Sequence, residues 1–358
     1  MLHATANWRI HPRKLVLIDL TFCKISQNEW NVFFLVCESN CAEQQYTQME
    51  HNLPLIPPNK WAKACSSYEG ISVATFNSLR RNYSFRGKHW VTEEEKDWNF
   101  RLQLHKQLLP YLSADIICIQ EAEVDTVEED FAFMKDFGYD LLKGVTNGKE
   151  DHTHTKPSIF YKAPKFQLKW FNHRSRTLLS LFEDEFGHCF YVIGCHLQGG
   201  SKCEDQRCFQ LKSTFQQLST HAKSMNIPET DLCAILCGDF NASPHQAVHQ
   251  LLRNGKLTED EVVSSFGKPG FNFQHNFRFE DSYANVKNRP YTIKFGIGKD
   301  SAYDLIDFLY FTPNTLEVQC VRDPLTREQK ELMVRTTCVP NSWHPSDHLP
   351  QVALFSFK

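Results

Sequence analysis

The sequence lacks several features that would indicate particular classes of protein. No two cysteines are separated by just two residues, so neither a zinc ribbon nor a dithiol redox motif is indicated. No apolar run approaches the ~18–20 residues that a membrane-spanning helix needs. The net charge is only −3, from 39 basic and 42 acidic residues, so no general affinity for polyanions is expected. Any contact with nucleic acid must therefore come from a local patch.

Cysteine and phenylalanine are plentiful, with 13 and 28 residues, and both indicate where this chain folds and how. Cys118, Cys233 and Cys237 lie in apolar runs, where thiols behave as small hydrophobic side chains. Thiols used as core residues indicate a reducing compartment, so we expect an intracellular protein, cytoplasmic or nuclear. The phenylalanines predict an aromatic-rich core in a chain long enough for one large domain or two ordinary ones.

Residues 1–68 differ in composition from the rest of the chain. They alternate short apolar runs with Gln, Asn and Cys and end in a stretch marked by Pro54, Pro57 and Pro58. We interpret them as an N-terminal extension and residues 69–358 as the main domain. Basic residues precede the first acid, Asp19, as in an organelle transit peptide, so a mitochondrial location is kept as an alternative.

Strand and helix patterns alternate through residues 69–358 without repeats. Thr92 and Glu95 form a predicted capping box that opens a helix to about Leu112, and Ser243-Pro244 predicts the start of a short helix. Other helices are predicted over 126–134 and 206–222, and strands over 71–76, 115–120, 158–161, 178–182, 190–196, 232–237, 305–311, 318–321 and 352–357. This alternation predicts one α/β domain with buried sheets.

Carboxylate and amide side chains follow two of the apolar strands. Glu121 comes directly after one of them, where a carboxylate is costly unless it is paired or bound to metal. Asp239 and Asn241 flank Phe240, so they point to the same side of an extended chain and can hold metal, orient water or contact phosphate. The alternatives are a solvated strand-capping carboxylate for Glu121 and an ordinary turn for the Asp-Phe-Asn stretch.

Two histidines and two further polar residues extend this set. Asp307 lies in an apolar strand and needs a partner, which Asp347-His348 can supply. We predict that Asp307 orients the imidazole of His348, as a carboxylate fixes the histidine tautomer in hydrolases. Asn77 and His196 also end predicted strands; read alone, they are typical of a turn residue and a core histidine.

A basic loop follows Asn77 in the sequence. It carries Arg80, Arg81, Arg86 and Lys88, and such a loop can contact backbone phosphates. The alternative is a solvated run of charges without a ligand. Composition does not decide between these two interpretations.

The motifs, taken in order, resemble the endonuclease/exonuclease/phosphatase superfamily of metal-dependent phosphodiesterases, and within it the branch of deadenylases, nocturnin and angel proteins. The matching stretches are TFNSL (75–79), DIICIQE (115–121), His196-Leu197, GDFNASP (238–244), IDFLY (306–310) and PSDHLP (345–350), with helix motifs at 98–101 and at Arg207 and Gln210. The resemblance covers residues 71–357.

The resemblance implies a four-layer α/β sandwich, with two mixed β-sheets packed face to face and helices outside. It also implies that residues 69–358 form a catalytic domain of this type. The cofactor implied is Mg²⁺, with Mn²⁺ as an alternative. Glu121 would be the chief metal ligand, helped by Asn77, and Asp347 would support the metal or its water.

The same resemblance implies roles for five residues in catalysis. His348, oriented by Asp307, would be the catalytic base. Asp239 would position the attacking water. Asn241 and His196 would contact the scissile phosphate, where added positive charge stabilises the transition state.

The activity implied is hydrolysis of single-stranded RNA by a 3′–5′ exoribonuclease that releases 5′-nucleotides. Alternatives are other phosphoesters of the same superfamily (tyrosyl-DNA, abasic DNA, a dinucleotide or a sphingolipid) and a catalytically inactive binding protein with this fold. The chain departs from the branch before the strand that begins at Ser158: Lys156 stands where an Asp-Gly stretch is usual. Lys156, Arg80 and Arg81 are therefore our candidates for binding substrate phosphates.

Overall fold

The computed structural model describes residues 22–26, 29–32, 53–67, 69–144, 155–174, 176–287, 289–295, 302–335 and 338–358. The chain divides into two compact units, Met1–Met49 and Glu50–Lys358. In the first unit, β1 (Phe22–Ser26) pairs antiparallel with β2 (Glu29–Val32). The second unit contains every residue that the sequence predicts to be functional.

Seven strands of the larger unit form one mixed sheet. In spatial order they are β3 (Leu55–Ile56), β16 (Leu316–Arg322), β17 (Gln351–Phe357), β4 (Ile71–Asn77), β5 (Ile116–Gln120), β7 (Ser158–Lys162) and β6 (Tyr139–Leu142). Neighbouring β4 and β5 are parallel, with Asn77 opposite Gln120. Their C-terminal ends therefore meet at one edge of the sheet, and Asn77 and Glu121 lie there.

Six strands form the second mixed sheet. Their order is β12 (Glu280–Asp281), β15 (Asp307–Phe311), β11 (Ala234–Asp239), β10 (Cys189–His196), β9 (Thr177–Asp184) and β8 (Phe166–His173). Parallel pairing of β10 with β11 places His196 opposite Asp239. A separate hairpin, β13 (Ile293–Phe295) with β14 (Ala302–Asp304), contacts the C-terminal loop through an Ile293–His348 bridge.

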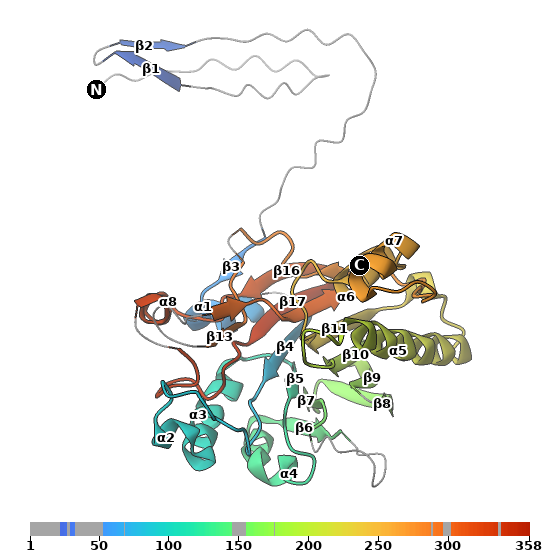
Figure 1. Cartoon of the computed structure of the whole chain (residues 1–358), viewed down its shortest axis with the longest axis horizontal. Coiled ribbons are helices and arrows are strands. Elements are labelled where there is room, and N and C mark those ends of the chain that lie inside the picture. The colour runs from blue at the N-terminus through green and yellow to red at the C-terminus, as the bar shows by residue number, and fades with distance from the viewer. Residues whose placement is uncertain are drawn as a thin grey trace. The chain divides into compact units, whose positions relative to one another are not determined.

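The two sheets pack face to face with helices on the outside (Figure 1). Val73 and Cys118 from one sheet share a buried cluster with Val192 and Cys237 from the other. A second cluster joins the seven-stranded sheet to α1 (Pro58–Cys65), α3 (Trp98–Tyr111) and α4 (Val127–Asp130). A third joins the six-stranded sheet to α5 (Glu204–Ser224), α6 (Ala247–Asn254) and α7 (Glu259–Phe266). The predicted four-layer α/β sandwich is confirmed.

Residues 55–65, which the sequence assigns to the N-terminal extension, form β3 and α1 of the larger unit. β3 pairs in parallel with β16, and the side chain of Trp61 is fully buried in the outer cluster. This part of the chain therefore belongs structurally to the sandwich. The division of function between residues 1–68 and residues 69–358 stays a prediction.

The helix predicted from Thr92 to about Leu112 is divided in the structure. It forms α2 (Glu93–Lys96), which is followed by α3. Asp97 is extended between them, and its carboxylate accepts a hydrogen bond from the backbone N–H of Phe100, so a new helix begins there. The predicted capping box at Thr92 is present. The other described helices are 3₁₀ helices η1 (Ala132–Phe137) and η2 (Glu229–Asp231), and α8 (Arg327–Arg335).

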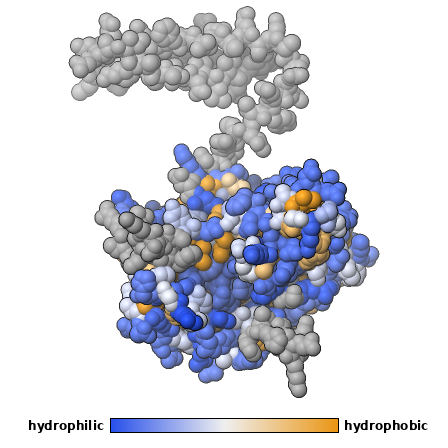
Figure 2. Space-filling view, in the orientation of Figure 1, coloured by the Kyte–Doolittle hydropathy of each residue, from blue (hydrophilic) through white to orange (hydrophobic). Residues whose placement is uncertain are grey.

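The surface of the larger unit is mostly hydrophilic on the face seen in Figure 2, with small hydrophobic patches. Phenylalanines such as Phe76, Phe182, Phe190 and Phe240 are instead fully buried, as the composition predicts. Within the described residues, no helix combines the length and the hydropathy that crossing a bilayer requires.

A buried histidine predicts how stability depends on pH. Burial lowers the pKa of His249 to about 3, although its Nε2 lies 2.9 Å from the carbonyl oxygen of Ala242. The unfolded chain takes up this proton near pH 6.5 but the folded chain resists it. The stability that this neutral histidine contributes is therefore fully present above about pH 6.5 and is lost progressively as the pH falls toward 3.

We expect the free energy of unfolding to decrease by about 2 kcal/mol from this group between pH 7 and pH 5. Urea titrations at both pH values measure the change. The His249→Gln variant cannot titrate, so its loss over the same range should be smaller by that amount. Equal losses in the two proteins would contradict the assignment.

Candidate active site

The ends of β4 and β5 place an amide beside a carboxylate. Asn77, the last residue of β4, donates from Nδ2 to Glu121 Oε1 (3.2 Å). Glu121 Oε2 accepts from the backbone N–H of Arg80 (3.1 Å). Asn77 Oδ1 accepts from the N–H of Leu79 (3.0 Å), so the amide nitrogen and not the oxygen faces the carboxylate. In this orientation Asn77 positions Glu121.

The second sheet supplies a row of three side chains at the same edge. His196 ends β10, Asp239 ends β11, and Asp307 begins the antiparallel β15 opposite Asp239. The backbone N–H groups of Ile306 and Asp307 both donate to Thr292 Oγ1, which holds the start of β15 in place.

Hydrogen bonds and ion pairs join these two edges into one site. Asn77 Nδ2 also donates to Asp239 Oδ2 (3.0 Å), so one amide bridges the two sheets. His196 Nε2 lies 3.9 Å from Glu121 Oε1 and 3.7 Å from Asp239 Oδ2. Residues from two sheets, separated by up to 162 positions in sequence, therefore converge on a single point.

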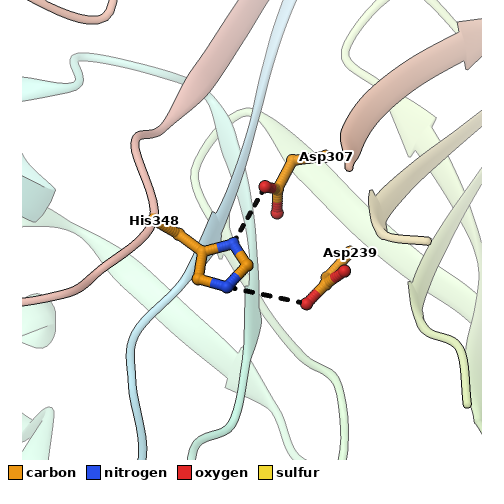
Figure 3. A group of neighbouring side chains, drawn as sticks. All are labelled: Asp239, Asp307 and His348. Atoms are coloured by element: carbon orange, nitrogen blue, oxygen red, sulfur yellow. Dashed lines mark hydrogen bonds and ion pairs between the residues drawn. The ribbon is translucent and has the colours of Figure 1, made fainter. Parts of the chain in front are cut away.

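The ring of His348 lies between two aspartates (Figure 3). Its Nδ1 is 2.9 Å from Asp307 Oδ2, and its Nε2 is 3.9 Å from Asp239 Oδ2. Burial alone lowers the pKa of His348, but Asp307 and then Asp239 outweigh it and raise the pKa to about 10. The contact that the sequence predicts between Asp307 and His348 is present. Its catalytic role stays a prediction.

Strained backbone occurs at two of these positions. Glu121 has φ of 64° and Asn241 has φ of 50°, a left-handed conformation that non-glycine residues seldom adopt. Such strain is concentrated at functional sites because the surrounding structure must hold it. Asn241 is held by its N–H, which donates to Asp239 Oδ1 (2.7 Å), and by its Nδ2, which donates to the Leu197 carbonyl (2.9 Å).

Gly238 is required by the close approach of β10 and β11. A Cβ atom at this position would lie 1.9 Å from the carbonyl oxygen of Cys195, and its φ is 150°. The first residue of the Gly-Asp-Phe-Asn stretch is therefore dictated by packing of the strand that carries Asp239.

Two buried arginines support the loops around the site. Arg101 donates to the carbonyls of Leu79 (2.6 Å) and Arg80 (3.0 Å) and to that of Pro345 (3.4 Å). It thereby ties the loop after β4 to the segment that carries His348. Arg207 donates to the Gln198 carbonyl (2.9 Å) on the opposite side. Both arginines therefore have structural roles in the loops that border the site.

The three predicted substrate-binding residues lie in different environments. Arg80 is exposed, and its backbone holds Glu121. Arg81 is 3.5 Å from Asp130 in an ion pair. Lys156 lies just beyond the end of β5, because β7 pairs with β5 from Ser158 onward, but its side chain is only 5% exposed.

Two site residues were not predicted from the sequence. Ser346 Oγ donates to the Asn77 carbonyl (2.6 Å) and accepts from the N–H of His348 (3.1 Å), so it fastens the C-terminal loop to β4. Lys88 Nζ lies 3.3 Å from Asp347 Oδ2. The sequence did indicate Lys88 as a member of the basic loop. Which basic side chain of that loop enters the site depends on the path of the loop, which the sequence does not give.

The donor set fits a hard divalent cation. Glu121, Asp239 and Asp307 bring three carboxylates together, and the charge of Asp347 acts on the neighbouring His348. The buried oxygens Asp307 Oδ1 and Asp347 Oδ1 have no hydrogen-bond partner. Asp239, Asp307 and His348 also offer ligand atoms within 4.8 Å of one another. Carboxylate oxygens are the ligands that Mg²⁺ prefers. Within this trio, His348 Nδ1 is already hydrogen-bonded to Asp307 Oδ2.

The carboxylates of Glu121 and Asp239 have pKa values shifted in opposite directions. Burial raises the pKa of Glu121, but His196 and the Arg80 N–H outweigh it, so the net shift is downward and this carboxylate stays charged. The pKa of Asp239 is raised by burial and by Asp307. The neighbouring rings of His348 and His196 offset part of this rise.

Comparison with known proteins identifies the family. The model of the Endonuclease/Exonuclease/phosphatase family matches residues 74–348, so the chain belongs to this family. Membership places it in the class of phosphodiester hydrolases.

Several fungal proteins named CCR4-Not complex 3′-5′-exoribonuclease subunit Ccr4 are similar to the chain. The Saccharomyces cerevisiae protein is 27% identical over 334 residues, which cover 80% of this chain and 39% of that protein. The Debaryomyces hansenii protein is 23% identical over 336 residues, with 80% and 39% covered. The chain thus spans about two fifths of the length of these relatives.

Solved structures share the fold. ANGEL2, described as a 2′,3′-cyclic phosphatase, superposes with a TM-score of 0.67 at 20% identity, covering 80% of this chain and 94% of that one. The human Nocturnin catalytic domain has a TM-score of 0.56 at 20% identity, covering 81% and 94%.

Proposed function

We propose that this protein is a Mg²⁺-dependent 3′–5′ exoribonuclease that releases 5′-nucleotides from single-stranded RNA. The observation that carries the proposal is the convergence of Glu121, Asp239 and His348 from two sheets and a C-terminal loop. The Ccr4 relatives, named 3′-5′-exoribonuclease subunits, support this choice of substrate and direction.

Glu121, positioned by Asn77, and Asp347 would hold a divalent cation, which when bound polarises the phosphate and lowers the pKa of water. Asp307 accepts a hydrogen bond from His348 Nδ1 and so fixes the tautomer that leaves Nε2 facing Asp239. A water held by Asp239 would give its proton to this nitrogen as it attacks phosphorus.

On the phosphate, two side chains at the same edge would bind the non-bridging oxygens. Asn241 and His196 flank Asp239 and can donate hydrogen bonds there, where negative charge builds up in the transition state. His348 must lose its proton before it can act as a base. The charge of a bound cation would lower the pKa of His348 and would so offset part of the effect of Asp307 and Asp239.

Arg80, Arg81 and Lys156 remain our candidates for contacts with the rest of the strand. Arg80 is exposed next to Glu121 and is free of the burial that limits Lys156. Arg81 would have to leave Asp130 to bind a phosphate. We also propose an intracellular location, cytoplasmic or nuclear, because the ten cysteines from Cys65 to Cys338 are free thiols.

The test is turnover of a 5′-labelled single-stranded RNA, in Mg²⁺ and in EDTA, with product ends resolved by mass. We expect a ladder that shortens from the 3′ end, nucleoside 5′-monophosphates as products, and no turnover in EDTA. Parallel assays use tyrosyl-DNA, abasic DNA, a dinucleotide and sphingomyelin. Cleavage of one of these alone would replace RNA as the substrate, and metal-independent turnover would overturn the proposal.

A further inference from the structure

The basic loop, residues 80–90, brings a cation into the site that the predicted phosphate-binding set omits. Arg81 is directed away, to Asp130 beside α4. The carbonyls of Leu79 and Arg80 are held by Arg101, which sets the path of the loop as it leaves β4. Farther along the loop, Lys88 points its ammonium at Asp347, the neighbour of His348.

Lys88 is held there loosely. Its Nζ is 3.3 Å from Asp347 Oδ2, longer than the ~2.7–2.9 Å of a strong charge-assisted bond. The ammonium also lies 4.5 Å from the centre of the Tyr83 ring, and the side chain remains 19% exposed. Asp347 keeps its other oxygen, Oδ1, buried without a partner. A cation so placed can exchange its carboxylate partner for a phosphate oxygen of a bound strand.

The position of Lys88 indicates which phosphate it would meet. The scissile phosphate belongs near Asn241 and His196, on the six-stranded sheet, with the base His348 facing it through Nε2. Lys88 approaches from the seven-stranded sheet through Asp347, one residue before that base. A phosphate at Lys88 would therefore be a neighbour of the scissile one in the strand.

We propose that Lys88 binds the phosphodiester adjacent to the scissile bond, releasing Asp347 as it does so. This rests on the proposed function, because it assumes a polynucleotide in the site. Both oxygens of Asp347 would then be available to the cation and its water once a strand with at least two phosphates is bound. Lys88 thus makes recognition of a chain, in preference to an isolated phosphoester, part of the same site.

A double-mutant cycle with modified RNA tests the contact directly. In a His348→Ala background, which keeps the strand intact, binding of labelled single-stranded RNA is followed by fluorescence anisotropy in Mg²⁺. One linkage at a time near the 3′ end is replaced by an uncharged methylphosphonate. Lys88→Met should weaken binding of all-phosphodiester RNA about tenfold and reduce the slope of log K against log salt by about 0.7, as for one lost phosphate contact.

On the RNA whose methylphosphonate lies next to the scissile linkage, Lys88→Met should have no further effect. Lys88→Arg should keep most of the affinity, and Lys96→Met, which removes the same charge from an exposed pair with Glu93, should change it less than twofold. Thermal melts establish that Lys88→Met is folded, since it leaves Asp347 without its partner.

An unchanged affinity and salt slope in Lys88→Met would overturn the inference. So would equal weakening on every methylphosphonate strand, because that pattern belongs to a lysine that acts through Asp347 alone. The cycle needs no turnover. If the otherwise unmodified enzyme fails to cleave RNA while the cycle gives the expected pattern, the proposed function fails and the phosphate contact stands.

Discussion

Replacing Glu121 with alanine should lower kcat/KM for RNA by at least ~10²-fold while the protein stays folded. Its carboxylate is the one that the seven-stranded sheet contributes at the end of β5, bound by Asn77 and by the backbone of Arg80. Without it, the cation would lose its chief predicted ligand. Single-turnover kinetics in Mg²⁺ measure the loss, and circular dichroism verifies the fold.

A binding readout separates this role from a purely structural one. Mg²⁺ should raise the melting temperature of the unmodified protein, since a ligand of the native state stabilises it by RT ln(1 + [L]/Kd). The rise should be absent in Glu121→Gln. The matched control is Glu123→Gln, two residues away, whose carboxylate accepts hydrogen bonds from Asn82. Near-normal activity in Glu121→Ala, or an equal loss in the control, would contradict the assignment.

His348→Ala should also cost at least ~10²-fold in kcat, with a smaller change in KM, because the lost group acts in the chemical step. The imidazole is fixed by Asp307 and aimed at Asp239, so no other described group has the same two contacts. Unlike Glu121→Gln, this variant should retain the Mg²⁺-induced rise in melting temperature.

Added imidazole should restore part of the turnover of His348→Ala, because the cavity left by the side chain can admit a free base. His245→Ala, which removes an exposed histidine after Asn241, serves as the control and should stay within twofold of normal. A variant with full activity would remove His348 as the base, and loss of the Mg²⁺ effect would move it to the cation site.

The sequence predicted those site residues whose position follows from where a strand ends along the chain. Apolar runs locate β5 and β11, so the sequence alone places Glu121 and Asp239 at strand ends. The pairing of Asp307 with His348 followed because a carboxylate inside an apolar strand requires a partner. These inferences needed no knowledge of how the two sheets face each other.

Details that depend on tertiary contacts were not predictable in the same way. Ser243 was expected to cap a helix, yet its hydroxyl donates to Asp304 and α6 begins after Gln246. A hairpin far along the chain competes for that side chain. The ion pair of Arg81 with Asp130, at 3.5 Å, was not foreseen either, because it forms only once α4 is in place; contact of Arg81 with substrate stays a prediction. The strand β8 was missed, although its alternating burial matches a pattern that its sequence contains.

The amide of Asn77 hydrogen-bonds to one carboxylate from each sheet, at 3.2 Å and 3.0 Å. These two hydrogen bonds connect the two sheets. A small shift of one sheet relative to the other would lengthen at least one of them. The proposed catalytic carboxylates Glu121 and Asp239 are therefore aligned with each other only while the two sheets keep their relative position. We therefore expect substitutions in the core between the two sheets, far from any phosphate, to change the reaction rate.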